Sequence, residues 1–397
     1  MARTSYLRRP LTAVLIAAAL AASVLMAAVM LASPAHAATF TVTNTNDSGP
    51  NSLRQAMLDA NASGVGNTID FAPGLSGPIR LYSGQLPVII AAGGGLTIDG
   101  RGAEITIDQL AEERVFKVDN NAALTLDTLY VQNGYAKGPD GYGGGIYNNN
   151  GYLTVRNSTI AYNKADLGGG GIYNTGRVGW IEVSNTTITN NSAGRGGGGI
   201  FNDNTGEFWA WNTTIYENSV YNDGVPGSTQ GGGGILLRDA AFAKLANTIV
   251  ANNQVPSQEG PTFPNCRAGW GENISDAGNN IDSGTTCGFD NGSLSNTDPL
   301  LDPEGLQDNG GLTKTIALQP DSPAVDLVGE EACPPPETDQ RGIERPQGDS
   351  CDSGAFELEQ QAEPKTKAEC KKGGHKEFGF KNQGQCIAFV NKAAHGR

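Results

Sequence analysis

Histidine is almost missing from this chain. Only three occur in 397 residues, at His36, His375 and His395, so none stands in the long central part of the sequence. No two cysteines have the C-x-x-C spacing either. A zinc site built from cysteine and histidine is therefore not expected, and we predict neither a metal ion nor a cofactor.

Long apolar runs are equally scarce, and the one present lies at the N-terminus. Basic residues precede an apolar run from Leu11 to Leu31, and Ala-His-Ala follows at 35–37. These are the parts of a secretory signal, which predicts 1–37 as the signal peptide and export of the remainder. Because the run is long enough to span a bilayer, an uncleaved anchor is the alternative. With cleavage, the mature chain has no transmembrane span.

Basic residues are few outside the C-terminal tail. The formal net charge is −14, and loss of the three signal-peptide arginines leaves −17. Residues 365–397 carry eight Lys or Arg against two Glu, so this tail has a charge of +6 and residues 38–364 a charge of −23. Such a body repels nucleic acid, which we exclude as a partner. The imbalance either keeps an exported protein soluble or lets the tail dock on an anionic surface or glycan.

The six cysteines all lie in the C-terminal third of the chain. An even number of cysteines in an exported chain predicts disulfides, because the compartment is oxidising. Six cysteines allow fifteen pairings, and the order in the sequence favours neighbouring partners. The expected bonds join Cys266 with Cys287, Cys333 with Cys351, and Cys370 with Cys386.

An internal repeat occupies residues 143–253. Four copies begin with Gly-Gly-Gly-Ile at spacings of 26, 28 and 35 residues, the last including an insertion at 221–230. Each copy holds short apolar stretches of period two. A unit of this size cannot bury its own apolar face, and it must therefore stack on its neighbours. This predicts an all-β fold, a parallel β-helix, and the right-handed crossover rule makes it right-handed. The four opening isoleucines are Ile146, Ile172, Ile200 and Ile235.

Asparagine recurs at one position of every copy, three residues after the second isoleucine. Asn tolerates the left-handed conformation of a sharp corner, and identical amides stacked at roughly 4.8 Å can hydrogen-bond along the solenoid. The predicted asparagine ladder consists of Asn163, Asn191, Asn218 and Asn252.

A single amphipathic segment precedes most of the strands. Apolar residues have helical spacing over 51–60, and Ser52 can cap the first turn. Because the first coil of a solenoid exposes an unpaired strand edge, we predict that this helix covers it.

The residues before position 358 contain several specific motifs. Together with Thr41–Asn61 and the GGGIYN coils, they resemble the bacterial choice-of-anchor Q family over about residues 39–358. The resemblance implies an exported β-helix protein held at the surface by differing C-terminal devices, and it implies no settled reaction. The closing motifs are Asp298–Leu301, Leu306–Gly311, Ser322–Asp326, Asp339–Gly342 and Cys351–Glu357.

The C-terminal device is unusual for that family. Neither an LPxTG-like motif nor an apolar helix follows Glu357. Residues 358–368 have the composition of a flexible linker. Residues 369–397 resemble a cysteine-paired module at the ends of other secreted bacterial proteins, although His375 stands where that module has Trp. The predicted units are the signal at 1–37, the β-helix with its N- and C-terminal caps at 38–357, the linker at 358–368 and the basic module at 369–397.

Parallel β-helices often carry polysaccharide lyases and hydrolases, but the residues that those reactions need are not aligned here. A glycosidase needs two carboxylates roughly 5–10 Å apart, and the acids between Asp166 and Asp239 fall at differing offsets in the repeat. A Gly-His-Gly motif like that of polygalacturonases is also absent, as is an aligned nest of acids for calcium. The densest charged group is expected to fasten the terminal cap. That group consists of Asp339, Arg341, Asp352 and Glu357.

Aromatic residues directly follow the opening isoleucine in three copies, at Tyr147, Tyr173 and Phe201. Strand alternation points them away from the isoleucine core. Joined by Trp209 and Trp211, they are candidates for a glycan-binding platform. The alternative, which we favour, is that these rings stack on one another beneath the loops that join the coils.

The predicted function is structural or adhesive. We expect a monomeric β-helix protein displayed at the cell surface or outside the cell, with an extracellular polysaccharide or the cell envelope as its partner. The alternative is a polysaccharide lyase or glycoside hydrolase acting on an extracellular polysaccharide, which only the analogy of fold supports.

Overall fold

The computed structural model describes residues 37–395 apart from several short segments. These segments are 65, 91–94, 178, 222–230, 258–259, 263, 270, 334–335, 361–363, 365 and 377–380. The predicted signal peptide therefore lies outside the described residues except for Ala37.

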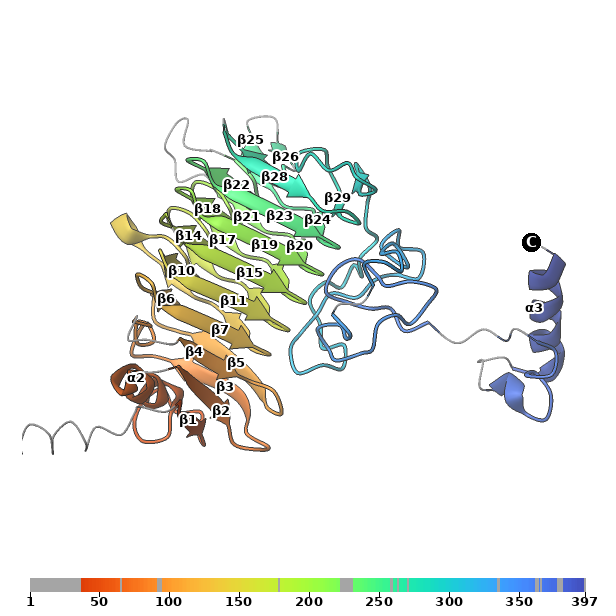
Figure 1. Ribbon diagram of the computed structural model, residues 1–397, viewed down its shortest axis with the longest axis horizontal. Coiled ribbons are helices and arrows are strands. Elements are labelled where there is room, and N and C mark those ends of the chain that lie inside the picture. The colour runs from red at the N-terminus through yellow and green to blue at the C-terminus, as the bar shows by residue number, and fades with distance from the viewer. Residues whose placement is uncertain are drawn as a thin grey trace, which may run out of the picture.

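Short strands stack in register into three long parallel sheets, as the repeat predicted (Figure 1). Sheet A contains β1 (Thr39–Val42), β2 (Asn67–Phe71), β4 (Leu96–Asp99), β7 (Ala123–Asp127), β11 (Tyr152–Arg156), β15 (Trp180–Ser184), β19 (Glu207–Trp211), β23 (Phe242–Ala246) and β28 (Asn273–Asp276). Sheet B contains β3 (Ser76–Leu81), β5 (Glu104–Gln109), β8 (Tyr130–Gln132), β12 (Thr159–Ala161), β16 (Thr187–Thr189), β20 (Thr214–Tyr216), β24 (Ile249–Ala251), β29 (Ile281–Asp282) and β30 (Leu294–Ser295).

Sheet C forms the third side of the solenoid. It contains β6 (Phe116–Val118), β10 (Ile146–Asn149), β14 (Ile172–Thr175), β18 (Ile200–Asp203), β22 (Ile235–Arg238) and β27 (Cys266–Ala268). The smaller sheet D contains β9 (Tyr135–Ala136), β13 (Lys164–Ala165), β17 (Ser192–Ala193) and β21 (Ser219–Val220). Outside these sheets and the two α-helices lie an antiparallel hairpin of β25 (Val255–Ser257) and β26 (Gly260–Thr262), and the 3-10 turns η1 (Gly138–Asp140) and η2 (Gly374–Lys376).

The core consists of columns of identical or similar side chains. The opening isoleucines of the four copies pair in register and are fully buried. Every coil supplies one member of each column, so the apolar face that a single copy cannot bury is covered by its neighbours. The predicted parallel β-helix is confirmed.

The N-terminal end of the solenoid is covered by helix α2 (Leu53–Ser63), which packs on β1 and β2. Ser52 accepts a hydrogen bond from the backbone N–H of Gln55, and Gly64 ends the helix in the left-handed conformation with a φ of 72°. The four apolar residues at helical spacing are buried. The predicted capping helix is confirmed.

A ladder of asparagine amides runs along the inside of one corner, with one correction to its predicted members. The Nδ2 of Asn163 donates to Asn191 at 3.0 Å, and the Nδ2 of Asn191 donates to Asn218 at 2.9 Å. Asn218 then donates to Asn253 at 2.9 Å, so the predicted Asn252 is not the fourth member. In the fourth copy Val250 occupies the inward position that Ile215 holds in the third, which moves the ladder by one residue.

The closing segment, residues 298–358, lies along the outer face of sheet B (Figure 1). Gln340 accepts a hydrogen bond from the hydroxyl of Thr187 at 2.7 Å and donates one to Thr159 at 2.9 Å. The backbone N–H of Ala355 donates to the hydroxyl of Thr214. The segment that we expected to cap the end of the solenoid therefore braces the side of several coils.

Three disulfides join the six cysteines in the order that the sequence suggested, namely Cys266–Cys287, Cys333–Cys351 and Cys370–Cys386. The last bond ties the start of the C-terminal module to helix α3 (Gln383–His395). Of the helices described, neither combines the length and the apolar character that crossing a bilayer requires.

Candidate functional site

The outer faces of the three sheets differ in how far they are covered. On sheet B all residues of β12, β16, β20 and β24 are buried, because the closing segment covers their outer side. On sheet C, β18 is buried throughout, and β14 and β22 are buried except at their last residue. Only the first repeat strand of that sheet, β10, alternates between buried and partly accessible residues. The strands of sheet A alternate in this way in all four copies. Sheet A is thus the sheet whose outer face is accessible along all four repeat strands.

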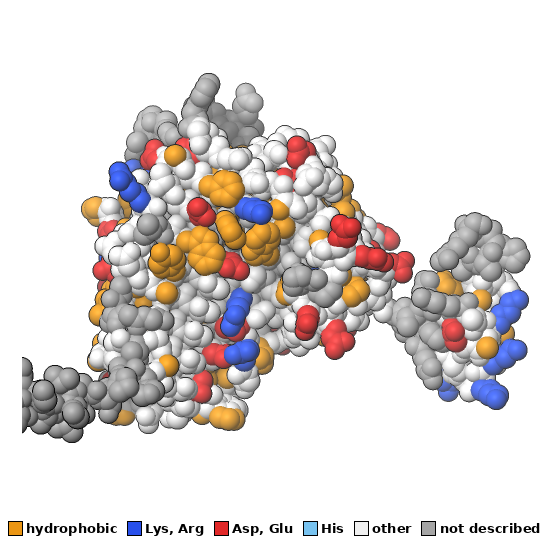
Figure 2. Space-filling model, viewed as in Figure 1, with side chains coloured by type: hydrophobic (Ala, Val, Ile, Leu, Met, Phe, Trp, Pro, Cys, Tyr) orange, Lys and Arg blue, Asp and Glu red, His pale blue; other side chains and the backbone are white. Residues whose placement is uncertain are grey.

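Three tryptophans cluster in the middle of that face. The ring centroids of Trp180 and Trp209 lie 6.0 Å apart, and those of Trp209 and Trp211 lie 5.9 Å apart. Both pairs are edge-to-face, a favoured geometry for aromatic rings. All three side chains remain partly accessible. Figure 2 shows hydrophobic side chains gathered over β15, β19 and β23.

Parallel register places two more aromatic and two charged residues around the cluster. Tyr152 pairs with Trp180, and Phe242 lies two strands beyond Trp180 in the same column. Glu182 and Lys244 flank Trp209 from its two neighbouring strands. The Nζ of Lys244 lies 5.8 Å from the Trp209 ring centroid and 5.6 Å from that of Trp211, a cation–π geometry. We call this set of side chains on the outer face of sheet A the tryptophan platform.

The row formed by Tyr147, Tyr173 and Phe201 has a different environment, and the structure corrects its proposed role. It lies on sheet C, so Trp209 and Trp211 of sheet A do not join it. Tyr173 is 5% exposed and Phe201 is 2% exposed. The rings pack on one another, with centroids 5.2 Å apart for both neighbouring pairs. The stacked arrangement, and not an open platform, is what the structure contains.

A glycine-rich loop explains why this row is covered. A Cβ on Gly168 would lie 2.3 Å from the Phe201 ring, so the backbone of the coil-joining loop rests directly on that side chain. The hydroxyl of Tyr173 also donates to the buried Asp203 at 2.8 Å. Burial and the Asp203 carboxylate raise the pKa of Tyr173. Only glycine permits so close an approach. The repeated Gly-Gly-Gly indicates close packing of the backbone, but it does not indicate which side chain lies beneath.

Trp180 and Lys244 were not identified from the sequence as site residues. The register of the neighbouring coils could have identified them. Aligning the copies pairs Trp180 with Glu207 on the strand that holds Trp209 and Trp211, and it pairs Lys244 with Trp209. Among the described residues no group of three His, Cys, Asp or Glu is placed to hold a metal ion.

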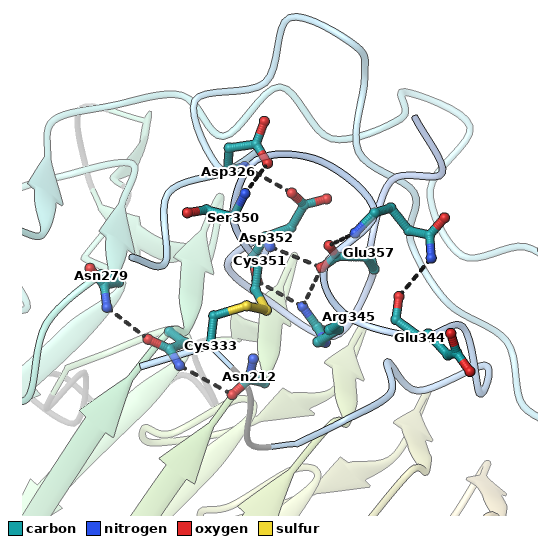
Figure 3. The surroundings of a disulfide bond; sticks show 12 residues. Asn212, Asn279, Asp326, Cys333, Glu344, Arg345, Ser350, Cys351, Asp352 and Glu357 are labelled. Atoms are coloured by element: carbon teal, nitrogen blue, oxygen red, sulfur yellow. Dashed lines mark hydrogen bonds and ion pairs between the residues drawn. A yellow bond between two sulfur atoms is a disulfide. The ribbon is translucent and has the colours of Figure 1, made fainter. Parts of the chain in front are cut away.

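The closing segment contains four buried charged side chains, those of Asp339, Arg345, Asp352 and Glu357. Three of them, Arg345, Asp352 and Glu357, lie near the Cys333–Cys351 disulfide (Figure 3). The Nη1 of Arg345 lies 2.8 Å from the Oε2 of Glu357, and both side chains are fully buried. The same carboxylate oxygen accepts the backbone N–H of Asp352, beside the Cys333–Cys351 disulfide. Asp339 pairs separately with Arg341 at 2.8 Å. The charged group thus fastens the closing segment through ion pairs and hydrogen bonds, with Arg345 as a member that the sequence had not indicated.

Burial raises the pKa of Asp352 to about 7, and the negative charge of Glu357 adds to this effect. Hydrogen bonds from the backbone N–H groups of Leu358 and Asp326 oppose it. A carboxyl whose pKa is raised on folding binds a proton more tightly in the folded state than in the unfolded state. Protonated Asp352 therefore stabilises the folded state at low pH. This contribution is lost as the pH rises from 3.8, the ordinary pKa of the carboxyl, towards 7.

We expect the closing segment to be less stable at pH 8 than at pH 5, by at most about 3 kcal/mol for a shift of this size. Asp352→Asn, which imitates the protonated carboxyl, should flatten that dependence. Thermal unfolding and hydrogen exchange of residues 298–358 at both pH values would measure it. An equally steep pH dependence in the variant would assign the effect to other groups.

Comparisons with known proteins give short or weak matches. Residues 185–203, which include β16, β17 and β18, match the model of the Chlamydia polymorphic membrane protein repeat. No curated protein matches the chain. Among solved structures, the crystal structure of pectate lyase Pel9A aligns with a TM-score of 0.41 and 13% identity, covering 81% of this chain and 96% of that chain. The family match thus corresponds to about one coil of the β-helix.

Proposed function

We propose that this is an exported β-helix protein, displayed outside the cell, that binds a polysaccharide on the tryptophan platform of sheet A. The observation that carries the proposal is the cluster of Trp180, Trp209 and Trp211 on the repeat face that is accessible in all four copies. Exposure of large aromatic side chains to water is energetically unfavourable, and clusters of such side chains commonly mark binding surfaces.

The chemistry of the platform suits sugar rings. The C–H faces of a sugar ring are apolar and pack on aromatic side chains, while its hydroxyls need hydrogen-bonding groups at the edge. Glu182 and Lys244 supply such groups on either side of Trp209. The aromatic residues extend over four neighbouring strands, from Tyr152 on β11 to Phe242 on β23. A row along the solenoid axis can contact successive sugars of one chain.

The charges favour an uncharged polysaccharide. Glu207 lies beside Trp180, and Glu182 lies beside Trp209. The body of the mature chain carries a charge of −23, so it repels polyanions over the range of the Debye length. At the platform, the single positive charge of Lys244 is outnumbered by the negative charges of Glu182 and Glu207.

The proposed location is supported by three independent features. The N-terminal sequence has the parts of a secretory signal. Three disulfides indicate an oxidising compartment. The choice-of-anchor Q resemblance, together with the match of one coil to a polymorphic membrane protein repeat, agrees with surface display.

Trp209→Ala is expected to weaken binding to a soluble neutral polysaccharide at least about tenfold, the effect of removing a central aromatic contact. Isothermal titration against a panel of neutral glucans, mannans and xylans would measure the loss. Tyr82→Ala is the matched control, because Tyr82 is 68% exposed and follows β3, away from the platform. Equal affinities of the two variants, or no binding by the unaltered mature chain, would overturn the proposal.

A further inference from the structure

The C-terminal module is a small scaffold held by one disulfide. Cys370 and Cys386 are fully buried, and Val390 of α3 packs against them with 7% exposure. So few buried apolar residues contribute little stability on their own, and the Cys370–Cys386 bond supplies the constraint.

The module presents an unusually uniform set of cations. All its described lysines are exposed. Figure 2 shows several basic side chains gathered on this part of the chain. The exposed lysines are Lys371, Lys372, Lys376, Lys381 and Lys392.

Most arginines of the body are used differently. Arg156, Arg238 and Arg345 pair with Asp127, Asp203 and Glu357 at 2.6–3.0 Å. Among the ion pairs between described residues, none includes a lysine of the module. The module thus offers unneutralised positive charge on a chain whose body is strongly acidic.

We infer that the module binds a linear phosphate-bearing polymer of the cell envelope. A polymer with regularly spaced charges gains from several lysines at once, because each contact releases counterions. Lysine ammonium groups bind phosphate as point charges. The exposed lysines of the module can therefore contact successive phosphates of one polymer.

This binding differs from that proposed for sheet A, because the ligand is a polyanion and not a neutral polysaccharide, and because the site is the C-terminal module. The acidic body repels a polyanion, so contact is confined to the basic end. Val390 of α3 packs against the Cys370–Cys386 disulfide, whereas Ile387 and Phe389 remain partly accessible. Anionic phospholipid vesicles are therefore included in the test. The two surfaces together would connect an envelope polymer at one end with a neutral polysaccharide along the side.

The test uses the full mature chain from Ala38 and immobilised poly(glycerol phosphate). A variant with Lys371, Lys372, Lys376 and Lys381 all changed to Gln is expected to bind at least about tenfold more weakly at low ionic strength. The slope of log affinity against log salt should fall by about one for each lysine removed. The same four positions changed to Arg keep the charge and should retain binding. Mass spectrometry of the Cys370–Cys386 peptide confirms that each variant keeps the disulfide.

Several outcomes would overturn the inference. Unchanged binding by the Gln variant would show that the lysines do not form the site. Equal binding to polygalacturonate would remove the preference for phosphate, and tighter binding to DNA or to anionic phospholipid vesicles would assign a different partner. Loss of neutral glucan binding in the Gln variant is not expected, because the platform lies on sheet A, so the two proposals can fail separately.

Discussion

Asn253→Ala is expected to lower the free energy of unfolding by about 3–5 kcal/mol, since it leaves several buried groups without partners. The Oδ1 of Asn253 accepts from both the backbone N–H and the Nδ2 of Asn218 at 2.9 Å. Its Nδ2 donates to the carbonyl of Ile215 and to Asn265. Asn253 is fully buried, so water cannot replace these bonds. Denaturant unfolding followed by circular dichroism would measure the loss.

The neighbouring residue provides a close control. Asn252 has a φ of 53°, and its Nδ2 donates a hydrogen bond to the hydroxyl of Tyr216 at 3.2 Å. Asn252→Gly keeps the left-handed conformation, because glycine adopts it without a steric penalty, and should cost less than about 1 kcal/mol. If this change were as damaging as Asn253→Ala, the ladder would not be the main source of the stability at this corner.

Arg345→Met is expected to destabilise the closing segment by about 3–5 kcal/mol, because it leaves the buried Glu357 carboxylate without its cation. Arg345 also donates to the backbone carbonyls of Asp352 and Gly354 at 2.8 Å, and these acceptors lose their partner as well. The outer face of sheet B, which carries Thr159, Thr187 and Thr214, should then become accessible to solvent. Limited proteolysis within residues 298–358 and hydrogen exchange of sheet B would detect the release.

An exposed ion pair gives the comparison for this second effect. Arg80 lies 3.9 Å from Asp108, and its side chain is 54% exposed. Because exposed pairs contribute little, Arg80→Ala should change the free energy of unfolding by less than about 1 kcal/mol. Similar proteolysis of both variants would mean that the buried charges do not fasten the segment.

The repeat made most of the architecture predictable from sequence. The strands of each copy are too short to form a stable sheet alone, so the copies must stack in register. Identical residues of successive copies then lie in columns. The ladder shows where this reasoning fails by one step. The alignment treated Ile249 as the inward residue of its copy, but Ile249 pairs with Thr214 and points outward. A shift of one residue exchanges the two faces of a strand.

Coverage of the outer faces was much harder to predict. Alternation correctly pointed Tyr173 and Phe201 away from the isoleucine core. It carries no information on the glycine loop that covers Phe201 or on the Tyr142 ring that stacks on Tyr173. The closing segment meets sheet B through contacts such as Thr159 with Lys314, which are 155 residues apart in the sequence. Nothing local in either segment specifies such a pairing. The open face of sheet A became apparent only when the covers of sheets B and C were known.

Hydroxyl-radical footprinting of the mature chain with a neutral polysaccharide that binds it tests the sheet A platform most directly. We expect oxidation of Trp180, Trp209 and Trp211 to fall when the polysaccharide is added, while oxidation of the exposed Tyr82 stays the same. The polysaccharide should be recovered at its original length. Unchanged oxidation of the three tryptophans would contradict the binding face, and shortened or unsaturated products would show that the protein is an enzyme.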